Sequence, residues 1–160
     1  MEDILKILEK DARTSPERIA QMTGRTVEQV RDLLHKAEQD GVVFGYQALV
    51  DWRKLGRDEV NALIEVKVSP QRDVGFDAIA ERIAKFPEVR SLQLVSGDYD
   101  LAVQVVGRNL YDVSSFVSEK LAPMQGVQAT TTHFLLKRFK ENGVLLTGGN
   151  IPTARLAVTP

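Results

Sequence analysis

The sequence predicts an α+β fold class, with an N-terminal tri-helical (winged) helix-turn-helix followed by a ferredoxin-like β-α-β-β-α-β sandwich domain. The first observation is the helical spacing of apolar residues in the first forty residues, interrupted by glycines that can end helices. The second is a change of pattern after residue 60, where alternating stretches typical of strands are separated by two helical stripes. Their order along the chain is that of a split β-α-β domain.

Three short helices are expected at the start of the chain, and the first has an apolar stripe formed by Ile4, Leu5, Ile7 and Leu8. Ser15 can cap a second helix that begins at Pro16, where the missing N–H costs nothing, and Gly24 ends that helix. Thr26 followed by Gln29 is a capping-box pattern for the third helix. A tight turn with a glycine before the third helix is typical of a helix-turn-helix.

A β-rich stretch at residues 42–50 predicts a strand, and the polar residues after it predict a hinge. The elements expected next are a strand NALIEVKV, a helix VGFDAIAERIAKFP, strands VRSLQLVS and DLAVQVVG, a helix LYDVSSFVSEKLAPMQG and a strand VQATTTHFLLKRF. The tail contains a candidate edge strand, ARLAV. The expected divisions of the chain are 1–41 (helix-turn-helix), 42–60 (β-segment and hinge), 61–145 (ferredoxin-like domain) and 146–160 (tail).

Each predicted helix of the second domain carries one apolar stripe. On the first helix the stripe consists of Phe76, Ile79, Ala80, Ile83 and Phe86. On the second helix it consists of Leu110, Val113, Phe116, Val117 and Leu121. Alternation along NALIEVKV places Ile64, Val66 and Val68 on one face of the predicted strand.

Composition narrows the classes of function. The 160 residues contain no cysteine, which excludes disulfides and thiolate metal sites and suits a cytoplasmic location. The two histidines, His35 and His133, do not predict a histidine-rich metal centre. No apolar run approaches the roughly 18 residues that span a membrane. There is no P-loop, no G-x-G-x-x-G and no G-x-S-x-G, and we expect no cofactor and no metal.

A short acidic turn joins two of the predicted strands, at Ser96-Gly97-Asp98-Tyr99-Asp100 within LVSGDYDLAVQV. Glycine and aspartate are the commonest residues of hairpin turns for local backbone reasons. The other interpretations are an acid pair for catalysis or metal binding, and the lip of a small-molecule pocket. A metal site would need further carboxylates or histidines close by, which the sequence does not place there.

Three helices followed by β-α-β-β-α-β form a more specific combination than either half alone, and several motifs accompany it. IAQMTG and VRDLLHKAEQDGVV lead into FGYQALVDWRKLG, and VSGDYDLAVQV follows in the hairpin. On these motifs the chain resembles the Lrp/AsnC (feast/famine) family of bacterial and archaeal transcription regulators, over about residues 2–145. The resemblance implies that the N-terminal half binds double-stranded DNA. It also implies that the C-terminal half senses a small effector, usually an amino acid, and forms homodimers that commonly assemble into octamers.

The resemblance places an effector pocket at an interface between dimers, with the acidic turn on its lip. The effector-binding residues it implies are Ser96, Gly97, Asp98, Tyr99, Asp100, Thr130, Thr131 and Thr132. The glycine would let a ligand approach the backbone closely. Asp98 or Asp100 could receive an α-ammonium group, backbone N–H groups could hold a carboxylate, and the threonine hydroxyls at the start of the last strand could complete the site.

The third predicted helix would be the recognition helix of such a regulator. Its candidate DNA contacts are Arg25, Thr26, Glu28, Gln29, Arg31, His35 and Lys36. Gln29 could pair with an adenine edge and Arg31 with guanine or phosphate, while Arg25 and Lys36 could hold phosphates. The alternative is that these residues form a solvated face of an amphipathic helix.

Charge counts against tight DNA binding. The whole chain has a net charge of −1, and residues 1–60 contain ten Lys and Arg against twelve Asp and Glu, a net charge of −2. Phosphate contacts supply most non-specific affinity, so an acidic DNA-binding half is atypical. The family also often has basic residues where this chain has Asp32 and Leu33. The alternative function is therefore an oligomeric metabolite-binding module with weak or no DNA binding.

The β-rich stretch at residues 42–50 has two interpretations. In the family the corresponding segment pairs with its partner's copy, and Phe44, Tyr46 and Leu49 would supply the apolar contacts. The other interpretation is a wing that packs on the helices of its own chain.

An enzyme of the same architecture, such as a siroheme decarboxylase, is the remaining alternative. Those enzymes use histidines near a tetrapyrrole, whereas this chain has SGDYDLAVQV where a histidine-containing pattern would be expected. His133 lies in a Thr-rich predicted strand, where a structural role in the sheet is expected. We expect that the chain is not an enzyme.

Overall fold

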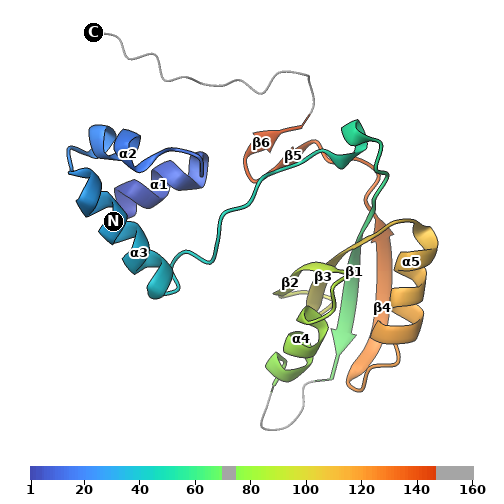
Figure 1. The fold of residues 1–160 in the computed structure, drawn as a ribbon. Coiled ribbons are helices and arrows are strands. Elements are labelled where there is room, and N and C mark those ends of the chain that lie inside the picture. The colour runs from blue at the N-terminus through green and yellow to red at the C-terminus, as the bar shows by residue number, and fades with distance from the viewer. Residues whose placement is uncertain (70–74, 147–160) are drawn as a thin grey trace. The chain divides into compact units, whose positions relative to one another are not determined.

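The chain divides into two units, one made of helices and one built on a sheet (Figure 1). The computed structural model describes residues 1–69 and 75–146. The first unit is Met1–Asp51 and the second begins at Trp52, so the division falls inside the stretch interpreted as a hinge. The predicted α+β class, with helices first and a ferredoxin-like sheet domain after them, is confirmed.

Three helices make up the first unit: α1 (Glu2–Lys10), α2 (Pro16–Thr23) and α3 (Val27–Gln39). The capping motifs expected from the sequence are formed. The Ser15 hydroxyl accepts a hydrogen bond at the start of α2, Gly24 ends α2 with φ of 67°, and Thr26 and Gln29 form a complete capping box at the start of α3. The core of this unit consists of Ile4, Leu8, Ile19, Ala20 and Val30.

The strand predicted over residues 42–50 is absent, and residues 43–50 have no regular structure. Phe44 is 97 % exposed, and Tyr46 and Leu49 are exposed as well. Aromatic and β-branched residues favour strands because they pack against a neighbouring strand. This segment has no such neighbour in the described chain, so the interpretation as a wing within one chain is wrong.

The second unit is built on a four-stranded antiparallel sheet. Its elements are η1 (Trp52–Leu55), β1 (Val60–Val68), α4 (Asp77–Ala84), β2 (Val89–Leu94), β3 (Leu101–Gly107), α5 (Leu110–Ser115), the π-helical stretch η2 (Phe116–Leu121) and β4 (Val127–Phe134). The strands lie in the order β2-β3-β1-β4. β1 is therefore a central strand, paired with β3 on one side and β4 on the other.

One face of the sheet carries the core of the second unit. Ala62, Ile64 and Val66, alternate residues of β1, are fully buried in a cluster that includes side chains of α4, α5 and η2. Phe86, just past the end of α4, meets Phe116 edge to face, with 5.5 Å between the ring centroids. Both helical stripes therefore cover the same face of the sheet.

One residue of the stripes predicted for the second domain does not join the core. Leu110 is 58 % exposed. It is the first residue of α5 and follows Asn109, whose side-chain oxygen caps the helix by accepting a hydrogen bond from the Asp112 N–H at 2.9 Å. The part of the helix that covers the sheet begins only at Val113, which is buried.

A hairpin that we did not predict follows β4, and it consists of β5 (Lys140–Glu141) and β6 (Val144–Leu145). Asn142 and Gly143 form its turn, with φ of 46° and 81°. An Asn-Gly pair is a strong hairpin signal because both turn residues need positive φ, so the sequence contained the information. The candidate edge strand ARLAV lies outside the described residues.

Candidate functional site

The candidate DNA-contacting residues lie on the outer side of α3 and in the turn before it. We call this set the α3 surface: Arg25, Thr26, Glu28, Gln29, Arg31, His35 and Lys36. All of these except Arg25 are exposed, and Arg25 is partly buried. At 3.6 residues per turn, Glu28, Asp32 and His35 share the middle of the exposed side, opposite the buried Val30. The fold therefore brings the predicted contacts to one surface, but the centre of that surface is acidic.

Two arginines of the α3 surface are paired with carboxylates from other helices. The guanidinium of Arg25 donates a hydrogen bond to Asp3 of α1. Arg31 Nη2 lies 2.9 Å from Glu17 Oε1 of α2. These ion pairs connect α1 to the turn and α2 to α3. Sequence reasoning missed both, because 22 and 14 residues separate the partners along the chain.

The lysine of the α3 surface is also paired. Lys36 Nζ lies 3.5 Å from Asp40 Oδ2, one helical turn further along. This spacing is a sequence signal, since residues four apart are neighbours on a helix surface. Exposed pairs of this kind are weak, about 0–1 kcal/mol. These ion pairs still engage the positively charged groups that would otherwise be available to a DNA phosphate.

Two other members of the α3 surface hold the start of the helix together. The Gln29 side-chain oxygen accepts a hydrogen bond from the Thr26 N–H at 3.0 Å, and the Gln29 N–H donates to the Thr26 hydroxyl at 3.2 Å. Adenine recognition by glutamine uses both the oxygen and the NH₂ group of the side chain. The structure therefore gives Gln29 a capping role in addition to its predicted contact with a base.

The pair between Asp3 and Arg25 has a consequence that can be measured by titration. The pKa of Asp3 is lowered from 3.8 to about 2, chiefly by the hydrogen bond from Arg25. The pKa of Asp3 is lower in the folded chain than in the unfolded chain, so the pair stabilises the folded state. This stabilisation is fully present at pH values above 3.8 and is lost as the pH falls through about 2. In a carboxyl-carbon NMR titration, Arg25→Gln is expected to return the Asp3 midpoint toward 3.8. An unchanged midpoint would contradict the assignment.

The acidic turn joins β2 to β3, and its last residue is anchored on β1. Asp100 Oδ2 accepts a hydrogen bond from the Val68 N–H at 2.8 Å, and the Asp100 N–H donates to the Val66 carbonyl at 3.1 Å. The Val95 N–H donates to the Asp100 carbonyl at 2.9 Å and closes the turn. One carboxylate oxygen of Asp100 therefore holds the turn against the sheet.

The other carboxylate of the turn is directed to solvent. Ser96, Gly97 and Asp98 are exposed, whereas Tyr99 and Asp100 are partly buried. Gly97 has φ of 144°, a conformation that glycine adopts readily. An exposed carboxylate beside accessible backbone can receive an ammonium group. The two acids, which the sequence left as equivalent candidates, thus occupy different environments, and Asp98 is the more accessible of the two.

The three candidate threonines lie in the middle of β4 rather than at its start. Thr130 pairs with Val66 and Thr132 with Ile64, so both are on the helix-covered face. Thr131 pairs with Glu65 and lies on the other face. β1 also separates β4 from β3, where the acidic turn ends. One chain therefore does not bring all three hydroxyls to one side of the sheet.

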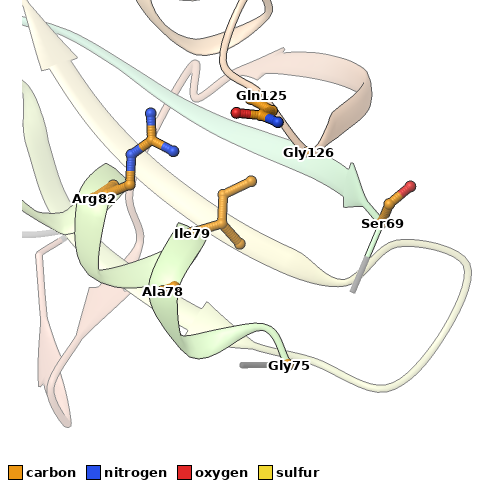
Figure 2. A pocket seen from close by; sticks show the side chains of 7 residues that line it. All are labelled: Ser69, Gly75, Ala78, Ile79, Arg82, Gln125 and Gly126. Carbon is orange, nitrogen blue, oxygen red and sulfur yellow. The ribbon is translucent and has the colours of Figure 1, made fainter. Parts of the chain in front are cut away.

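The sheet domain has a small hollow whose lining residues do not belong to the acidic turn (Figure 2). Ile79 and Arg82 of α4 line one side, and Gln125 and Gly126 line the other. Its volume is about 20 Å³. That is room for about one water molecule, so an amino acid does not fit inside it.

His133 lies on the same face of β4 as Thr131. Its Nε2 atom is 3.2 Å from Glu65 Oε1 on the neighbouring strand. This is the cross-strand contact of a sheet residue. In the described ranges, no three His, Asp or Glu side chains gather as metal ligands. Over the same ranges, no helix has the length and apolar character needed to cross a membrane.

Comparison with known proteins covers both units. The family model of the Lrp/AsnC ligand binding domain matches residues 61–145. An uncharacterised HTH-type transcriptional regulator of Bacillus subtilis is 45 % identical over 159 residues, which is 99 % of this chain and 95 % of that protein. The chain belongs to the Lrp/AsnC family.

Other proteins agree with this Lrp/AsnC membership. The leucine-responsive regulatory protein of Rhizobium meliloti is 33 % identical over 138 residues, covering 86 % of this chain and 88 % of that protein. A transcriptional regulator of Neisseria meningitidis, solved as a complex with L-Met, is 25 % identical with a TM-score of 0.70. That match covers 87 % of this chain and 89 % of the other. The relatives are thus transcription regulators, and they share both the helical unit and the sheet domain.

Proposed function

We propose that this Lrp/AsnC protein is a cytoplasmic transcription regulator and not an enzyme. It binds double-stranded DNA through α2 and α3 and responds to an amino acid bound by its sheet domain. The observation that carries the proposal is the match to an HTH-type transcriptional regulator over 99 % of the chain, so both units are covered. The similar regulator solved with L-Met supports an amino acid as the class of effector.

The effector site of the proposal lies between dimers. Within one chain β1 separates the acidic turn from the threonines of β4, which supports a site completed by a second copy. Asp98 receives the α-ammonium group, and exposed backbone of Ser96 and Gly97 faces the α-carboxylate. Asp100 keeps the turn in place through its hydrogen bond to Val68.

The dimer of the proposal is formed in part by the segment around Phe44. This side chain is 97 % exposed, with Tyr46 and Leu49 also exposed nearby in the chain. Pairing of the segment with its copy in a second chain would cover this apolar surface and supply the strand neighbour that one chain lacks. Higher assembly, up to an octamer, would place the effector sites between such dimers.

The DNA contacts of the proposal are those of the α3 surface. Residues at the start of a recognition helix reach base edges, which gives that role to Glu28 and Gln29. Arg25, Arg31 and Lys36 contact phosphates. An effector can change DNA binding only as far as it binds one assembly better than another, so assembly state and DNA affinity should change together.

A thermal-shift screen of the standard amino acids tests the effector site. At a concentration 100 times its Kd, an effector that binds only the folded chain stabilises it by about 2.7 kcal/mol. We expect at least one amino acid to raise the melting temperature, and Asp98→Ala to abolish that rise without lowering the melting temperature of the free chain. A screen in which no amino acid shifts the melting temperature would contradict the amino-acid class.

The second candidate function is an oligomeric metabolite-binding module with little DNA binding. It is favoured by the net charge of −2 over residues 1–60 and by the pairing of the arginines and the lysine of the α3 surface. A gel shift at low salt separates the two functions, since a regulator shifts duplex DNA and the module does not. Tetrapyrrole absorbance after mixing tests the alternative of a decarboxylase-like enzyme.

A further inference from the structure

Two separate ion pairs connect the helices of the first unit, one from α1 to the α2–α3 turn and one from α2 to α3. Asp3 lies in the first turn of α1 and accepts a hydrogen bond from Arg25. Glu17 lies in the first turn of α2 and accepts one from Arg31 at 2.9 Å. Both carboxylates are about half exposed, at 48 % and 54 %. They are therefore at the surface beside two of the cations that the proposed function assigns to DNA.

A carboxylate and a phosphate make the same demand on an arginine. The guanidinium group binds either anion through the same planar set of N–H donors. A donor directed at Asp3 or Glu17 is not directed at a DNA phosphate, and each carboxylate also repels a phosphate nearby. Hydrogen bonding lowers the pKa of both acids. The main donor to Asp3 is the guanidinium of Arg25, and the main donor to Glu17 is its own backbone N–H. Both are therefore ionised at neutral pH.

We infer that Asp3 and Glu17 compete with DNA phosphates for Arg25 and Arg31, and thereby lower the affinity of the chain for DNA of any sequence. The inference rests on the proposed DNA-binding function. Exposed ion pairs are weak, so a phosphate can replace the carboxylate when α3 is well placed on the duplex. Phosphate contacts carry the sequence-independent part of affinity, whereas base contacts carry specificity. Competition of this kind reduces the time spent on non-specific DNA.

If the same ion pairs instead position the arginines for DNA, removal of the carboxylate charge should change DNA affinity in the opposite direction. If Glu17 served to position Arg31 for DNA, removing its charge would leave the arginine less ordered and weaken binding. If Glu17 competes with phosphate, removing its charge frees the arginine and strengthens binding. DNA affinity therefore separates the two roles, which a measurement of stability alone would not do.

The experiment measures binding of the full chain to a fluorescently labelled duplex of arbitrary sequence by anisotropy, over a series of salt concentrations. Glu17→Gln and Asp3→Asn are each expected to tighten binding about threefold to tenfold at low salt. Each should also steepen the dependence of log K on log salt by about 0.9 for every additional phosphate that a chain neutralises. Glu2→Gln is the matched control, because it removes the same charge from a pair with Lys6 within α1. It should change affinity much less.

A second variant keeps the test valid if one substitution disturbs folding. Arg31→Gln should cancel the tighter binding produced by Glu17→Gln, because the freed cation is then absent. Circular dichroism of each variant shows whether the helices are retained. The inference is overturned if Glu17→Gln and Asp3→Asn bind the duplex no more tightly than the wild type, or gain only as much affinity as Glu2→Gln. The proposed function is unaffected by that result. Failure of every folded chain to bind the duplex overturns the proposed function, and the inference with it.

Discussion

Phe116→Ala is expected to destabilise the sheet domain by about 3–5 kcal/mol, the range for truncating a buried phenylalanine. Phe116 is 2 % exposed and lies in the core between the sheet and the helices. Its ring also makes the edge-to-face contact with Phe86. The substitution removes the apolar contacts of the ring and leaves a cavity that close-packed neighbours fill only in part.

Urea unfolding followed by hydrogen exchange of β1 and β3 amides measures this loss in the second unit. Tyr111→Ala is the matched control, since Tyr111 is an aromatic residue of the adjoining α5 that is 75 % exposed. Its truncation is expected to change the free energy of unfolding by no more than about 0.5 kcal/mol. Equal effects of the two substitutions would show that the ring of Phe116 is not part of a packed core.

Asp100→Ala is expected to destabilise the sheet domain by about 1–3 kcal/mol, which is the cost of leaving a buried donor without its acceptor. The donor is the N–H of Val68, a residue only 4 % exposed, and its hydrogen bond to Asp100 is 2.8 Å long. Asp98→Ala, two positions away, removes an exposed carboxylate and should leave stability nearly unchanged.

Thermal unfolding of Asp98→Ala, Asp100→Ala and Asp100→Asn measures the difference. The asparagine variant keeps an oxygen that can accept from Val68, so it should lose less stability than the alanine variant. Together with the amino-acid screen, these variants distinguish a residue that holds the turn in place from a residue that binds the ligand. Asp98→Ala should lose the ligand and keep the fold, and the reverse result would exchange the assigned roles of the two acids.

Local sequence signals predicted the parts of the fold that local physics determines. The Ser15 cap, the Gly24 stop and the Thr26–Gln29 capping box each depend on residues within one helical turn, and each is present in the structure. Alternation and helical stripes likewise predicted the order of elements in the sheet domain. The hairpin around Asn142 also depends on local residues, because the Asn142-Gly143 pair supplies the positive φ angles of its turn.

The candidate sites depended more on contacts between distant residues, which local patterns do not contain. Arg31 looked free in the sequence because Glu17 belongs to another helix. Asp100 looked equivalent to Asp98 because its partner, Val68, is 32 residues away. The strand expected around Phe44 failed for a related reason, since strand formation requires a neighbour and none is supplied by the described chain.

The central position of β1 has a mechanical consequence. The chain leaves the helical unit through the segment around Phe44, passes through η1 and joins the sheet at β1. This strand carries four buried residues and is hydrogen-bonded on both sides. Tension that reaches the sheet domain along this connection is therefore applied to its most firmly held strand. Pulling that strand out requires breaking its ladders with β3 and β4 together. The connection can thus carry a pull into the sheet domain without peeling away an edge of the sheet.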